Sequence, residues 1–99
     1  MVDSVTGTAL SGLQASSTRI QVAADNIANA STPNYKTVAV RQTTDPTGDV
    51  KTDVVKTNTA PNIDEQLVNV DTASVEFQAN LKVLRAQQDM STHLFDIQA

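Results

Sequence analysis

The chain has 99 residues, a formal net charge of −4, no cysteine and 3% aromatic residues. A chain of this length forms one small domain at most, with a modest core. Its seven lysines and arginines are scattered, which argues against a nucleic-acid-binding surface. The lack of cysteine excludes disulfides and thiol chemistry, and no apolar run approaches the roughly 20 residues that a membrane-spanning helix needs.

The first predicted element is a helix from about Ser4 or Thr6 to Asn29. Two rows of residues recur in it every seven positions, one bulky and one small, as in the seam of a coiled coil. The bulky row is Leu13, Ile20 and Ile27, and the small row is Ala9, Ser16, Ala23 and Ala30. A partner helix could approach closely over the small row. We expect the opposite face, with Thr18, Arg19 and Asp25, to be polar.

Pro33 ends this helix, because its ring disfavours the helical conformation at Thr32. Pro33 suits the second position of a β-turn over Thr32-Pro33-Asn34-Tyr35. Asn34 suits the third, where a type II turn needs a positive φ. We therefore expect the chain to reverse here.

The segment that follows is rich in threonine and valine, with alternation at Val38 and Val40. The stretch Asp45-Pro46-Thr47-Gly48 is a good turn signal. We predict a β-hairpin that pairs Thr37–Thr43 with Val50–Lys56. An isolated two-stranded hairpin is marginal in water, so the alternative is an extended, partly mobile linker.

The last predicted element is a long helix that ends near Ile97. Asn62, with Glu65 three residues later, resembles a capping box, but Asp71 or Thr72 is an equally good cap. If the helix begins at the later cap, residues 66–70 are extended.

Apolar residues occupy two faces of this helix at 100° per residue. One face carries Phe77, Leu81 and Leu84. The other carries Val75, Ala79, Val83, Ala86, Met90, Leu94 and Ile97. A helix that is apolar on two sides is usually buried on two sides. We expect the first helix to cover one face and another molecule to cover the other.

Nothing in the chain points to catalysis. His93 is the only histidine, and it has no cysteine partner and no carboxylate at a recognised ligand spacing. One histidine without a nucleophile motif does not define a triad, and three glycines do not make a phosphate-binding loop. Asp45, Asp49 and Asp53 fit a solvated hairpin end better than a cation site. We expect no enzyme activity, no metal and no cofactor.

Asn26 and Asn29 lie one turn apart near the predicted end of the first helix. Their amides can bond the last free carbonyls of the helix or a neighbouring backbone. Local capping and a contact to a paired helix or a neighbouring subunit both remain open.

The run from Ala9 to Lys36 resembles the N-terminal motif of bacterial flagellar axial proteins, the family of rod, hook and hook-associated subunits, and most of all its small rod proteins. The motif blocks in this chain are Ala9-Leu10-Ser11-Gly12-Leu13, Arg19-Ile20-Gln21-Val22-Ala23, Asn26-Ile27-Ala28-Asn29 and Thr32-Pro33-Asn34-Tyr35-Lys36. Asp25 stands where the family has Asn, and Asn34 stands where it has Gly. The blocks 68–71, 77–83 and 89–97 resemble the family's terminal helix, with about one heptad less between the first two.

The resemblance implies a mainly α fold in which the terminal helices pair as an antiparallel, coiled-coil-like hairpin around a small β-hairpin. Its segments would be 1–36, 37–61 and 62–99, together one axial domain. It implies a structural subunit of the flagellar basal body that takes part in motility. The partners would be other rod or axial subunits, further copies of the chain and the flagellar type III export apparatus, with no nucleic acid and no membrane insertion.

The assembly contacts expected on this basis are the two helix faces and the turn. The helix contacts are Leu13, Ile20, Ala23, Ile27, Phe77, Leu81, Leu84, Met90 and Leu94, and the motif and turn contacts are Asn26, Asn29, Thr32, Pro33, Asn34 and Tyr35. The first residues lack a charged region followed by an apolar one, so we expect export to the periplasm-spanning rod without a cleaved signal peptide. The alternative function is a soluble helical-hairpin adaptor that binds one cytoplasmic flagellar or secretion partner.

Overall fold

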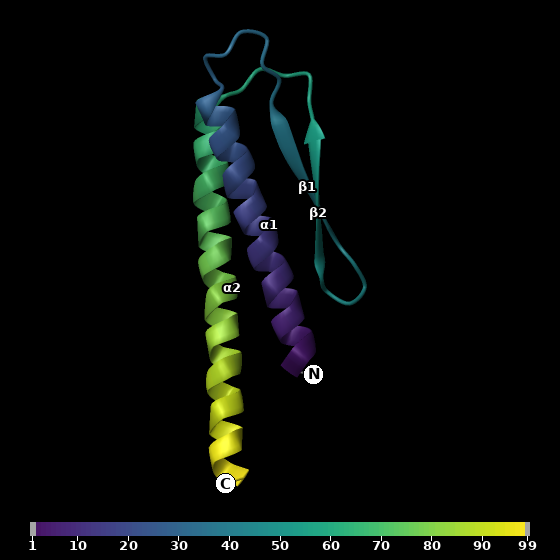
Figure 1. Cartoon of the computed structure of the whole chain (residues 1–99), viewed down its shortest axis with the longest axis vertical. Coiled ribbons are helices and arrows are strands. Elements are labelled where there is room, and N and C mark those ends of the chain that lie inside the picture. Colours follow the sequence, from purple (N-terminus) through teal and green to yellow (C-terminus); the bar gives the residue numbers. More distant parts are fainter. Residues whose placement is uncertain (1, 99) are drawn as a thin grey trace.

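The computed structural model describes residues 2–98 and the side chains of residues 5–97; residues 1 and 99, the outer limits of the first and last expected segments, lie outside that range. The elements are α1 (Val2–Ala28), β1 (Val38–Thr44), β2 (Val50–Lys56) and α2 (Ile63–Gln98). The two helices run antiparallel, with the β-hairpin beside them (Figure 1). The molecule is elongated, with extents of 63 × 24 × 13 Å. The predicted mainly α fold, a helical pair with a small β-hairpin, is confirmed.

Helix α1 begins at Val2, earlier than predicted, and ends at Ala28. Beyond it the Tyr35 amide donates to the Thr32 carbonyl at 3.3 Å, and Asn34 has a φ of 63°. A hydrogen bond across four residues, with a positive φ at the third, is the geometry that a type II turn needs. The predicted reversal at Thr32–Tyr35 is confirmed.

The two strands form an antiparallel pair whose register runs from Val38↔Lys56 to Thr44↔Val50. The predicted hairpin is therefore confirmed, with its first strand shifted by one residue. In the connection, the Asp45 carboxylate accepts hydrogen bonds from Thr47 and from the Asp49 amide, and Gly48 has a φ of 94°. Chiefly through the Thr47 hydroxyl, these bonds hold the pKa of Asp45 below its ordinary value.

Helix α2 begins directly after Asn62. The Asn62 side chain accepts a hydrogen bond from the Glu65 amide at 3.3 Å, and its carbonyl accepts one from the Gln66 amide at 3.0 Å. Asp64 and Glu65 in the first turn complement the positive end of the helix dipole. The expectation that residues 66–70 could be extended is wrong, because the earlier of the two possible caps starts the helix.

The hairpin packs on α1, so that α1 lies between it and α2 (Figure 1). The Val50 amide donates to the Ser11 hydroxyl at 3.0 Å, and the Thr8 hydroxyl donates to Asp49 at 3.2 Å. These bonds fix the far end of the hairpin to the N-terminal half of α1. Over the described residues, neither strand packs against α2.

The core is built from small side chains. The buried apolar residues are Ala9, Ala15, Ala23 and Ala73. Gly12 and Ser16 are also buried, so the other elements cover the small row predicted for the first helix from Ala9 to Ala23, while Ala30 lies beyond α1 and is half-buried. The bulky row, Leu13, Ile20 and Ile27, is only half-buried. Small residues let two helices approach closely, but they bury little apolar area and so contribute little hydrophobic stabilisation.

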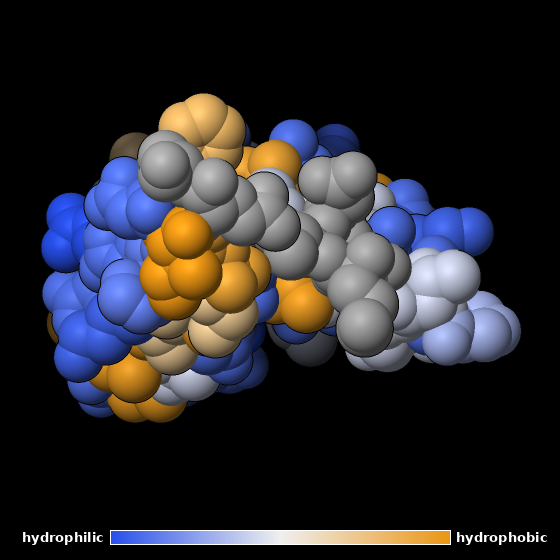
Figure 2. All heavy atoms as spheres, turned by 90° about the horizontal axis from the view of Figure 1, so that it is seen from below, coloured by the Kyte–Doolittle hydropathy of each residue, from blue (hydrophilic) through white to orange (hydrophobic). Residues whose placement is uncertain are grey.

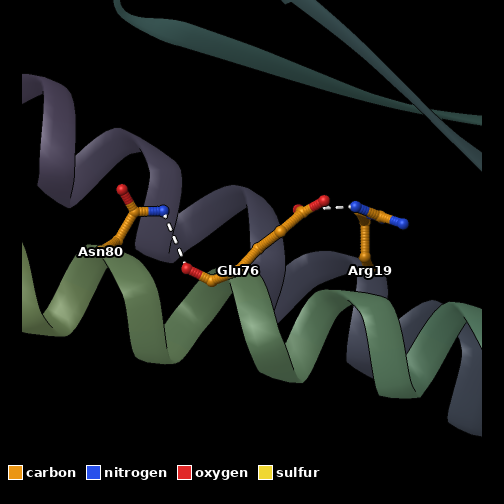
Figure 3. Close-up of polar contacts among 3 residues, drawn as sticks. All are labelled: Arg19, Glu76 and Asn80. Atoms are coloured by element: carbon orange, nitrogen blue, oxygen red, sulfur yellow. Dashed lines mark hydrogen bonds and ion pairs between the residues drawn. The ribbon is translucent and has the colours of Figure 1, made fainter.

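Arg19 departs from the prediction. It was expected on the polar face of α1 opposite the seam, but its side chain is only 19% exposed and donates to the Glu76 carboxylate of α2 at 2.7 Å (Figure 3). Arg19 lies at the edge of the helix seam, where the charge of Glu76 on α2 can reach it. In the described part of the chain, neither helix has the length and apolar character needed to cross a membrane.

Candidate functional site

Asn26 joins three elements of the fold through one fully buried side chain. Its amide nitrogen donates to the Val38 carbonyl at 2.8 Å and to Gln66 Oε1 at 3.0 Å. Its amide oxygen accepts from the Val38 amide at 3.0 Å. Asn26 thus pairs with Val38 as a neighbouring strand would, and at the same time it ties α1 to α2.

This geometry assigns Asn26 an intramolecular role. The helix-pair contact expected for it is present, but the side chain has no exposed surface left for a neighbouring subunit. Asn29 instead makes a local cap, since its amide nitrogen donates to the Asp25 carbonyl at 2.9 Å. Its amide oxygen accepts from the Thr32 hydroxyl at 3.2 Å, which links the cap to the turn.

The turn residues lie at one end of the molecule. Thr32, Pro33 and Asn34 are exposed and Tyr35 is half-buried. Their side chains are available to another molecule, unlike that of Asn26. The turn is therefore a surface feature, tied to the end of α1 by the bond between Thr32 and Asn29.

The inner face of α2 faces α1. Phe77, Leu81 and Leu84 are half-buried there, and Ala73 is fully buried. At the closest point, a Cβ atom built on Gly12 would lie 2.6 Å from Nδ2 of Asn80. The Asn80 amide nitrogen is held by the Glu76 carbonyl at 3.2 Å (Figure 3). A side chain at Gly12 would therefore press on the Asn80 amide.

The outer face of α2 is uncovered. Its members, called the outer stripe below, are Val68, Val75, Ala79, Val83, Ala86, Met90, Leu94 and Ile97, and all are exposed. The large ones are between 43% exposed (Val83) and 67% exposed (Ile97). At 100° per residue the outer stripe spans an arc of about 100°. Seen from the end where α2 terminates, hydrophobic side chains lie at the surface among hydrophilic ones (Figure 2).

An exposed apolar face of this kind marks an interaction surface. Met90 and Leu94 lie on it, while the other helix contacts predicted from sequence line the inner seam. Contacts that sequence reasoning missed include Ser11, Gln66 and Glu76. Ser11 stands inside the motif block 9–13, so the block was a signal for it; nothing in the sequence marked Gln66.

The described residues hold no group of three or more acidic, histidine or cysteine side chains placed to bind a metal ion. His93 is exposed on α2. A groove of about 400 Å³ lies between the hairpin and the helices, lined by residues that include Arg19, Thr37, Thr59 and Gln66. Its polar side chains bond within the fold, Arg19 to Glu76, Thr37 to the Thr59 carbonyl and Gln66 to Asn26.

Residues 7–36 match a protein family described as flagella basal body rod protein. The matched segment covers most of α1, both asparagines and the whole turn. No curated protein matches the chain significantly. The match confirms the N-terminal part of the resemblance, and it supports a role as a structural component of the flagellar basal body.

Proposed function

We propose that this chain is a structural subunit of the bacterial flagellar rod, and that it joins neighbouring axial subunits by helix packing. The observation that carries the proposal is the uncovered outer stripe of α2, in a molecule whose α1 and turn match the rod family. An apolar face with nothing to cover it in its own chain is stabilised when another subunit buries it.

The two faces of α2 have different roles in this proposal. The inner face, with Phe77 and Leu84, holds the helical pair together, while the outer stripe and the exposed turn contact neighbours. The partners are other rod or axial subunits. The chain reaches the basal body through the flagellar type III export apparatus, without a cleaved signal peptide, and it has no enzymatic role.

Subunit counting tests the location. Hook–basal bodies purified from the source organism, analysed by quantitative mass spectrometry, are expected to contain the chain at several copies per particle. Its absence from otherwise complete particles would overturn the proposal and favour the alternative function, a soluble adaptor.

Two variants test the outer stripe itself. Val83→Asp and Met90→Asp place a charge in it, so we expect both to abolish swimming in soft agar while the chain is still produced at a normal level. Gln78→Asp is the matched control, because it adds the same charge to an exposed position of α2 outside the outer stripe. Normal swimming of both stripe variants would contradict a role of this face in assembly.

A further inference from the structure

The spacing of the outer stripe has a symmetry of its own. From Val75 to Leu94 its six members follow one another at intervals of 4, 4, 3, 4 and 4 residues. This series reads the same in both directions, so a second α2 that runs the opposite way presents its apolar residues at the same heights. We propose that, before assembly, two copies of this chain pair through their outer stripes, antiparallel and about a two-fold axis between Val83 and Ala86.

The side-chain sizes fit this arrangement. With the axis midway between Val83 and Ala86, Ala79 of one copy meets Met90 of the second copy, and Val83 meets Ala86. In these two pairs a larger side chain lies over an alanine, which is how helix surfaces interdigitate, and the outer pair joins Val75 with Leu94. In a parallel pair without stagger, Met90 would meet Met90 and Ala79 would meet Ala79.

The charges beside the outer stripe favour the same direction. Lys82 and Asp89 are both exposed on the flank of the outer stripe that points away from α1. In a two-fold antiparallel pair, equal flanks of the two helices meet. Lys82 then lies about 3 Å along the axis from the second copy's Asp89, at 1.5 Å per residue, and the symmetry makes this contact twice. In a parallel two-fold pair opposite flanks meet, so Lys82 of one copy would not face Asp89 of the second copy.

The repeat length lets the contact persist along the helix. Val75 and Ala86, Ala79 and Met90, Val83 and Leu94, and Ala86 and Ile97 are each separated by 11 residues. An 11-residue repeat gives about 3.67 residues per turn, close to the 3.6 of a straight helix. Two such stripes can therefore lie alongside each other from Val75 to Leu94 with little supercoiling.

The inference shares the outer stripe with the proposed function and rests on that face being free. A two-fold contact is closed, because it leaves no equivalent face for a third copy. The pair is thus a form of the unassembled chain, which covers the apolar face until neighbouring subunits replace it.

Disulfide crosslinking tests the register. The chain has no cysteine, so Ala79→Cys and Met90→Cys introduce single thiols. Mixed under mild oxidation, the two variants are expected to form a disulfide-linked heterodimer. Ala79→Cys alone is the control, because its two copies would lie about 16 Å apart in the pair, too far for a disulfide. Rapid self-crosslinking of Ala79→Cys, or no crosslink in the mixture, would overturn the proposal.

A charge exchange tests the flank. Lys82→Asp is expected to raise the dimer dissociation constant about tenfold in analytical ultracentrifugation, and Lys82→Asp with Asp89→Lys to restore it. Circular dichroism checks that helix content is unchanged. A wild-type chain that stays monomeric at high concentration would refute the pair yet leave the proposed function intact, since basal-body counting and the swimming assay do not depend on it.

Discussion

At the residue scale, Asn26 shows how a short polar side chain can organise a small molecule. The chain buries few large apolar groups, so the hairpin is held mainly by hydrogen bonds. Asn26 supplies three of them from the end of α1, to β1 and to α2. A buried amide with all its partners fixes one arrangement of the elements, because any other leaves polar groups unpaired.

Replacing this side chain is expected to be costly. Asn26→Ala removes three hydrogen bonds and leaves buried groups of Val38 and Gln66 unpaired, so we expect a loss of about 3 kcal/mol in the free energy of unfolding. Urea denaturation followed by circular dichroism measures it. Asn29→Ala is the control, because it removes a local, partly exposed cap and is expected to cost about 1 kcal/mol or less. Equal effects of the two variants would contradict the role given to Asn26.

Asn34 offers a second prediction at this scale. Its φ of 63° lies in the left-handed region, which glycine adopts freely and alanine does not. We expect Asn34→Gly to leave stability within about 0.5 kcal/mol and Asn34→Ala to reduce it by about 1 kcal/mol. Thermal melts of the two variants test the turn, and an alanine variant as stable as the wild type would argue against this conformation.

Asn34 and Asn26 also show which structural details can be predicted from the sequence and which cannot. The conformation of Asn34 was predictable, because Pro33 beside it restricts the turn to few types. The partners of Asn26 were not, since they come from residues 12 and 40 positions away in the chain. Arg19 was misplaced for a similar reason. The periodicity of α1 gave the angular position of Arg19 on the helix. It did not show that Arg19 binds the carboxylate of Glu76, which lies 57 positions away in the chain.

At the element scale, the antiparallel helices are set close together by the small residues of α1. The heptad spacing made this pairing predictable, as did the two apolar faces of α2. The placement of the hairpin on α1 was not predictable, because it depends on the hydroxyls of Thr8 and Ser11. Water could satisfy these hydroxyls equally well, so the sequence does not mark them as contacts.

Gly12 gives the element-scale prediction. Alanine at this position gains about 1 kcal/mol in helix propensity but brings a Cβ atom against the Asn80 amide. We expect Gly12→Ala alone to change stability little, and the double variant Gly12→Ala with Asn80→Ala to be about 1 kcal/mol more stable than Asn80→Ala alone. A double-mutant cycle in urea measures the coupling. Strict additivity would show that the two residues do not press on each other.

At the scale of the whole molecule, α2 is longer than its partner. It has 36 residues against 27 in α1, and it continues past the N-terminal end of α1 (Figure 1). Residues 91–97 are all exposed. A helix end without a packed neighbour has only its own hydrogen bonds to hold it.

Hydrogen exchange is expected to separate the two parts of α2. At concentrations where the chain is monomeric, amides of residues 91–97 should exchange at least tenfold faster than those of residues 73–84, which pack on α1. Mass spectrometry of peptic fragments measures the difference. Uniform protection along α2 would contradict the packing described. Addition of the partner subunits is expected to slow exchange in the last turns.

The alanine-rich seam also sets how the chain responds to force. Its fully buried apolar groups, over the described residues, are single methyl groups, and the larger side chains of the seam are already half-exposed, so separating the helices exposes a modest apolar surface at each step. We expect a force applied at one end of the chain to separate the two helices step by step and at low force. In the role proposed above, such a seam would let the subunit unfold for export with little work and pair its helices again afterwards.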